Sequence, residues 1–86
     1  MKVRIPTPLR SYTNQEAVVT AAGATVSEVL DDLDRQFPGM RFRIVDEQGK
    51  LRPYIRVFVN RTQLMRLDAA LKETDEVHIL QALAGG

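Results

Sequence analysis

The sequence predicts an α+β domain in which a mixed β-sheet carries one main helix across one face. A chain of 86 residues has room for one domain with one modest core. Residues 25–37 combine a helix-capping motif with apolar residues at helical spacing, and several short segments alternate apolar and polar residues as half-buried strands do. This mixture favours a helix packed on one face of a sheet.

The first unit is predicted to be a β-hairpin. Val3 and Ile5 alternate with basic neighbours, which is the period-2 pattern of a strand with one buried face. Prolines follow directly and remove backbone donors, so the end of this strand is expected to be irregular. Residues 11–16 are polar and predict a turn, and residues 17–21 form the second short strand.

The helix is the clearest element of the chain. Thr25 and Glu28 form a T-x-x-E capping box, which satisfies backbone N–H groups at a helix start. Pro38-Gly39 ends the helix. Between these signals the apolar residues share one helical stripe that is expected to face the core: Val26, Val29, Leu30, Leu33 and Phe37.

Two further strands are predicted in the second half of the chain. Residues 54–59 alternate most clearly, with Ile55, Val57 and Val59 on the inner face, and residues 60–61 form a turn after them. Residues 77–80 form the last strand. Residues 40–46 fit either a short strand or a helical turn, and the sequence leaves that choice open.

This order of elements suits a β-grasp fold, the architecture of ubiquitin. In that fold the first and last strands pair centrally and in parallel, and the helix packs across the inner face of the sheet. Residues 1–80 are then the domain, and residues 81–86 are a flexible C-terminal tail that ends in Gly85-Gly86.

Composition excludes several classes of function. The net charge is +1 with acids and bases mixed along the chain, whereas nucleic-acid binders usually carry a basic cluster. Cysteine is absent and His78 is the single histidine, so no metal site is expected. No catalytic set is evident, and we expect no enzyme activity of its own. The lack of a long apolar run predicts no membrane association and a cytoplasmic location.

The chain end is the best candidate for chemistry. Glycine has no Cβ, so Gly85-Gly86 can enter a channel too narrow for other residues. A terminal carboxyl has a pKa of about 3.3–3.7 and is ionised at neutral pH. A carboxylate is a poor electrophile and must be activated, which adenylation by ATP would do. The plain alternative is that two terminal glycines are simply a frayed end.

Several segments resemble the MoaD/ThiS family of sulfur carriers, which are relatives of ubiquitin. The resemblance covers nearly the whole chain, and within the family residues 5–10 with Thr13, and residues 82–86, are most similar to the carrier that feeds a cysteine synthase. Many members have proline near Gln81 and Asp-Gly-Asp where this chain has residues 73–75. The resemblance rests on these segments: the helix at 25–37, Ile55-Arg56-Val57-Phe58-Val59-Asn60, Asp75-Glu76-Val77-His78-Ile79 and Ala84-Gly85-Gly86.

The resemblance implies a mechanism and its partners. An E1-like, ATP-dependent activating enzyme adenylates the carboxylate of Gly86, a sulfur donor displaces AMP to leave a thiocarboxylate, and a cysteine-synthase-like enzyme accepts the sulfur. The carrier itself binds no cofactor and is expected to be a monomer when free. Three alternatives stay open: the small subunit of molybdopterin synthase acting with its large subunit, a protein modifier joined to lysines through Gly86, and an interaction module with an inert tail.

Strand alternation predicts where these partners dock. If the valines and isoleucines of the strands face the core, an apolar pair ringed by basic groups faces outward and forms a candidate partner surface. Phe58 and Leu80 are expected to be exposed there, and Leu83 and Ala84 are expected to contact the partner along the tail. The outward residues are Arg4, Arg56, Phe58, His78 and Leu80.

Overall fold

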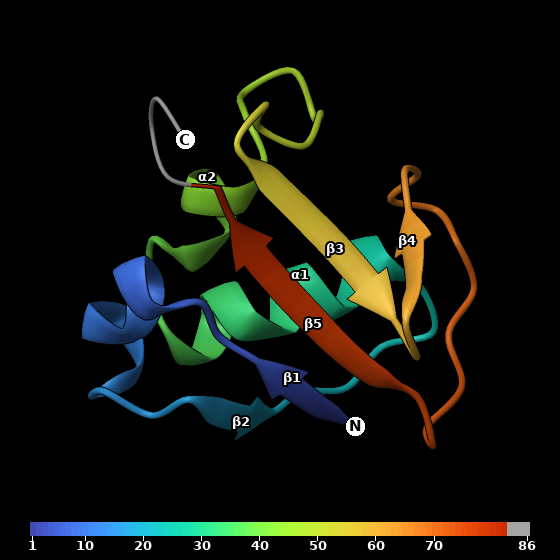
Figure 1. The fold of residues 1–86 in the computed structure, drawn as a ribbon, viewed down its shortest axis with the longest axis horizontal. Helices are drawn as coiled ribbons and strands as arrows, with labels where there is room; N and C mark the ends of the chain where they lie inside the picture. The colour runs from blue at the N-terminus through green and yellow to red at the C-terminus, as the bar shows by residue number, and fades with distance from the viewer. Residues whose placement is uncertain (83–86) are drawn as a thin grey trace.

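The computed structural model describes residues 1–82 and confirms the β-grasp fold. Five strands form one sheet in the order β2-β1-β5-β3-β4, and β1 pairs with β5 in parallel at its centre (Figure 1). Strands β1 and β2 form the first hairpin, and β3 pairs antiparallel with both β4 and β5. The strands are β1 (Lys2–Arg4), β2 (Val18–Thr20), β3 (Ile55–Val59), β4 (Thr62–Leu64) and β5 (Glu76–Gln81).

Helix α1 (Val26–Gln36) begins where the capping motif predicts. The Thr25 side chain accepts a hydrogen bond from the Glu28 backbone N–H at 3.2 Å. The Glu28 carboxylate reaches back to the N–H of Ala24 at 3.1 Å, one residue before the cap. The helix crosses one face of the sheet behind β5 (Figure 1), with its predicted apolar stripe buried from Val26 to Leu33.

The core lies between α1 and the inner face of the three central strands. Its strand residues are the alternating ones that the sequence assigned to that face, and each is at most 8% exposed. Burial of this apolar area is the main source of stability in a domain of this size. These residues are Val3, Ile55, Val57, Val59, Val77 and Ile79, together with Ile5, which directly follows β1.

The segment after β1 differs from the prediction. Residues 11–13, expected to begin a turn, belong instead to a 3₁₀ helix, η1 (Thr7–Thr13), which starts at the prolines because their fixed φ suits a first helical turn; residues 14 and 15 do form a turn, as predicted. Leu9 and Thr13 are buried, and the Thr13 hydroxyl donates to the Glu16 carbonyl at 2.8 Å. Its buried polar group is therefore satisfied.

The ambiguous segment forms a short helix, α2 (Met40–Ile44). The Asp34 carboxylate accepts N–H groups from Gly39 and Arg41, both at 3.1 Å, and so satisfies donors at the start of α2. Gly39 has φ of +96°, a value that favours glycine. Met40 and Ile44 are buried.

The turn predicted between β3 and β4 is present. Asn60 and Arg61 have φ of 48° and 75°, as the two central residues of a type I′ hairpin turn do. Within residues 1–82, none of the helices is both long and apolar enough to cross a membrane.

Candidate functional site

The root of the tail, Gln81 and Ala82, is held at the end of the central strand of the sheet. β5 lies between β1 and β3, and its last residue, Gln81, pairs with Ile55. The next N–H, that of Ala82, donates to the Tyr54 carbonyl at 2.7 Å. Gln81 was expected to begin the tail, but it belongs to β5, because the start of β3 extends far enough to pair with it.

The remaining tail residues carry the predicted chemistry. Leu83, Ala84, Gly85 and Gly86 lie outside the residues that the structure describes, so their predicted roles stay predictions. What the structure does establish is their starting point. They follow in sequence from the end of β5, the central strand of the sheet, where Gln81 pairs with Ile55 of β3.

The five residues predicted to face outward do share the face opposite α1. His78 lies opposite Arg4 on β1 and opposite Phe58 on β3, and Arg56 pairs with Leu80. The face is hollowed beside these strands, with a volume of about 800 Å³. The hollow is lined by Arg4, Phe58, Asn60, Arg61, Glu76, His78 and Leu80.

Exposure on this face differs from the prediction at one residue. Leu80 is 47% exposed, as expected. Phe58 was expected to be exposed but is half-buried, because its ring lies on a middle strand with β4 and β5 on either side. Arg56 is exposed, and its Nη1 donates to the carbonyls of Pro53 at 2.6 Å and Ile55 at 3.0 Å, so it lies along the start of β3 rather than in the hollow.

Glu76 is a residue of this face that the sequence reasoning missed. Its Oε1 accepts from Arg4 Nε at 2.6 Å and lies 2.8 Å from His78 Nε2. The hydrogen bond from Arg4, followed by that from His78, lowers the pKa of the Glu76 carboxyl from its ordinary value of 4.5. The signal was available, since residue 76 has the same strand parity as residues 78 and 80.

Asn60 links the β3–β4 turn to the start of β5. Its side-chain amide donates to Asp75 Oδ1 at 2.7 Å, and its Oδ1 accepts the Glu76 N–H at 3.0 Å. A backbone hydrogen bond from Lys72, followed by the Asn60 amide, lowers the pKa of the Asp75 carboxyl. These bonds fix the entry of β5 and therefore the position of the outward residues that follow it.

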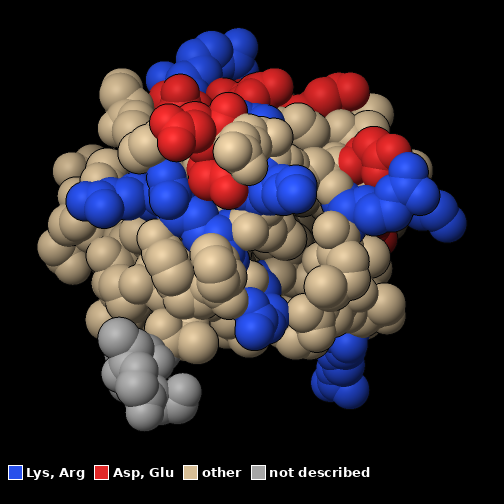
Figure 2. Space-filling model, turned by 90° about the horizontal axis from the view of Figure 1, so that it is seen from above, with Lys and Arg blue, Asp and Glu red and all other residues tan. Residues whose placement is uncertain are grey.

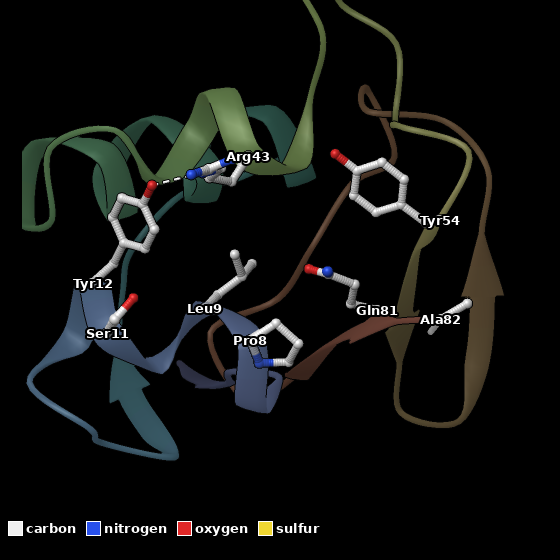
Figure 3. A pocket seen from close by; sticks show the side chains of 8 residues that line it. All are labelled: Pro8, Leu9, Ser11, Tyr12, Arg43, Tyr54, Gln81 and Ala82. Atoms are coloured by element: carbon white, nitrogen blue, oxygen red, sulfur yellow. Dashed lines mark hydrogen bonds between the residues drawn. The ribbon is translucent and has the colours of Figure 1, made fainter. Parts of the chain in front are cut away.

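A second surface lies beside the tail root. A groove of about 590 Å³ opens between η1, α2 and the paired ends of β3 and β5 (Figure 3). Sequence reasoning did not find it, because its walls come from segments far apart in the chain. It is lined by Pro8, Leu9, Ser11, Tyr12, Arg43, Tyr54, Gln81 and Ala82.

Among residues 1–82 there is no cluster of three or more His, Cys, Asp and Glu side chains that could hold a metal ion. Of the two surfaces, the groove includes Gln81 and Ala82, and the hollow of the outer face reaches Leu80, one residue before Gln81.

Comparison with known proteins identifies the family. The model of the ThiS family matches residues 3–86, which is nearly the whole chain and includes the terminal glycines. The chain belongs to the ThiS family. The resemblance seen in the sequence is therefore confirmed.

Individual relatives of this ThiS-family protein agree. The sulfur carrier protein CysO of Mycobacterium bovis is 36% identical over 89 aligned residues, covering 98% of this chain and 96% of the relative. A chain in the crystal structure of the Amycolatopsis orientalis BexX/CysO complex superposes with a TM-score of 0.90 at 42% identity, covering 99% of this chain and 98% of that one. The small archaeal modifier protein 3 of Haloferax volcanii is 33% identical over 66 residues, 73% of this chain and 71% of the relative.

Proposed function

We propose that this protein is a sulfur carrier whose working group is the carboxylate of Gly86. One observation carries the proposal: the ThiS-family match runs from residue 3 through Gly86, so it includes the glycine pair that follows the central strand. The similarity to CysO, a sulfur carrier, supports the same function. A carboxylate attached through glycines can enter a narrow active-site channel while the body of the protein stays outside.

The chemistry proceeds in three steps on partner enzymes. An E1-like activating enzyme lets the Gly86 carboxylate attack the α-phosphorus of ATP, which forms an acyl adenylate and releases pyrophosphate. A sulfur donor then adds to the acyl carbon and AMP leaves, so the terminus becomes a thiocarboxylate. An acceptor enzyme transfers the sulfur to its substrate, and water adds to the acyl carbon so that the carboxylate of Gly86 is regenerated. The carrier binds no cofactor and catalyses none of the steps, and a cytoplasmic location, where ATP is available, fits the cycle.

A cysteine-synthase-like enzyme is the proposed acceptor. The relatives that support it are CysO proteins, which are 36% and 42% identical to this chain. The large subunit of molybdopterin synthase is the alternative acceptor. A protein-modifier function is supported by the similarity to an archaeal modifier protein. Incubating the thiocarboxylated chain with each acceptor, or with lysine-containing proteins, separates these three activities.

The deciding experiment measures the intact mass of the chain. The protein is incubated with the activating enzyme of its own cell, ATP and a sulfide source. Replacement of one oxygen by sulfur, located on Gly86 by fragment masses, is the expected result. An unchanged mass with an enzyme shown to be active on another carrier, or a change elsewhere in the chain, would overturn the proposal.

A further inference from the structure

The groove beside the tail root has the composition of a binding surface. Leu9 forms its buried floor, and Pro8 lies exposed at its edge. Tyr12 and Tyr54 face each other across it (Figure 3), and Tyr54 is 39% exposed. Tyrosine presents a large contact area with little loss of side-chain freedom, and it is enriched among the residues that dominate binding energy at interfaces.

The groove carries one charged group, and it is positive. Of the eight side chains that line it, none is a carboxylate and one is a cation, Arg43. The Arg43 Nε donates to the Tyr12 hydroxyl at 2.6 Å, and its guanidinium carbon lies 5.7 Å from the centre of the Tyr12 ring. Arg43 is held in place before any partner arrives, which reduces the entropy lost on binding.

The surroundings of the groove do not cancel this charge. Within residues 1–82, no carboxylate lies within salt-bridge distance of Arg43. Seen from above, Lys and Arg side chains run across the middle of the view, and Asp and Glu side chains gather above them (Figure 2). An acidic group is the natural complement of such a surface.

The tail connects the groove to the proposed chemistry. Gln81 and Ala82 line the groove, and residues 83–86 follow directly. Four extended residues span at most about 14 Å. Any enzyme that takes Gly86 into its active site therefore brings the rim of its channel close to the tail root, where the groove lies.

We propose that this groove is a second docking surface, used together with the outer face of the sheet, and that it receives the channel rim of the activating enzyme. The rim presents a carboxylate to Arg43 and an apolar side chain to the space between the two tyrosines. This inference rests on the proposed function, since it is the need to deliver Gly86 that brings the two surfaces together.

The test is a charge reversal, Arg43→Glu, in the full-length chain, with binding to the activating enzyme measured by calorimetry without ATP. Arg66→Glu is the matched control, because Arg66 is 79% exposed on the β4–β5 connection and pairs only with the neighbouring Asp68 among the described residues. Arg43→Lys keeps the charge without the planar group. Denaturant melts verify that each variant is folded.

We expect Arg43→Glu to weaken binding about a hundredfold and Arg43→Lys about fivefold, while Arg66→Glu changes it less than about twofold. The loss should shrink in high salt, because exposed charge pairs are screened. Unchanged binding of Arg43→Glu would overturn the inference. So would tighter binding, which would mean that the groove holds the chain's own residues 83–86 and releases them in the variant.

The outcome is separable from the proposed function. The wild-type chain and the same enzyme are used in the mass measurement with ATP and sulfide. If wild type gains sulfur on Gly86 while Arg43→Glu binds normally, only the docking inference fails. If wild type binds but gains no sulfur, the proposed function fails whatever the groove does.

Discussion

The amide N–H of Ala82 donates a 2.7 Å hydrogen bond to the carbonyl oxygen of Tyr54, and within residues 1–82 it is the last bond that ties the end of β5 to the start of β3. It lies one residue beyond the pairing of Gln81 with Ile55. The tail available to a partner is therefore residues 83–86 rather than the six residues from 81 that alternation alone implied. The reach of the carboxylate is correspondingly shorter.

The bond between Ala82 and Tyr54 can be removed by one substitution at an exposed residue. Ala82→Pro deletes the N–H donor, and we expect a loss of about 0.5–1.5 kcal/mol in the free energy of unfolding, the usual net value of one hydrogen bond. Ala82→Ser, which keeps the donor at an exposed position, is the control. Equal stability of the two variants in urea titrations would show that this bond does not hold the tail root.

Leu33 tests the core. Its side chain is 0% exposed at the middle of the apolar stripe of α1, so truncation leaves a cavity between the helix and the sheet. We expect Leu33→Ala to lower the free energy of unfolding by about 2–5 kcal/mol. Leu80→Ala, at a residue that is 47% exposed, should cost well under that amount. A loss below about half a kcal/mol for Leu33→Ala would contradict its place in the core.

These elements show what local sequence can predict. α1 was predictable because its signals lie within the element: the Thr25 cap and apolar residues that repeat every turn. α2 was not predictable, because residues 40–46 fit both a strand and a helical period. The helix is favoured by the Asp34 carboxylate, which accepts N–H groups from Gly39 and Arg41. Contacts of that kind are decided by tertiary structure.

The candidate site divides in the same way. The outward face of the sheet was predictable from strand parity, and Arg4, His78 and Leu80 do lie together on it. The half-burial of Phe58 was not, because parity sets the direction of a side chain but not how far its neighbours cover it. The groove could not be predicted from the sequence, since Tyr12 and Arg43 become neighbours only when η1 packs near α2.

The outer face is predicted to bind the activating enzyme through Leu80. Removing an exposed apolar side chain costs the fold little, whereas at an interface it removes buried area, so we expect Leu80→Ala to weaken the complex about tenfold. Phe58→Ala should weaken the complex too, with a measurable loss of stability because Phe58 is half-buried. Calorimetry on folded protein gives both affinities, and Met65→Ala, at an exposed residue beyond β4, is the control. If Leu80→Ala and Phe58→Ala both bind with wild-type affinity, the outer face is not part of the interface.

The ion pair of Glu76 with Arg4 predicts that stability depends on pH in the acidic range. The hydrogen bond from Arg4 lowers the pKa of Glu76 in the folded protein below its ordinary 4.5. Its contribution to stability is therefore fully present above about pH 4.5 and is lost as the pH falls through the lower, folded value. We expect carboxyl NMR titration to give a pKa below 4.5 for Glu76 in wild type and a higher one in Arg4→Gln. The same pKa in both proteins would show that the ion pair does not form in solution.

The last prediction concerns the chain end itself. Deleting Gly86, or adding one alanine after it, moves the reactive carboxyl by up to about 3.6 Å, and the added alanine also brings a Cβ into a channel suited to glycine. Neither change touches the buried core, whose residues lie between Val3 and Ile79, so denaturant midpoints should match wild type. Binding to the activating enzyme without ATP should persist, because the body of the carrier is intact. Thiocarboxylate formation, measured by intact mass, should be abolished in both variants. If either variant gains sulfur at the wild-type rate, the position of the Gly86 carboxylate does not govern the reaction, and delivery of that carboxylate by a tail of fixed length is wrong.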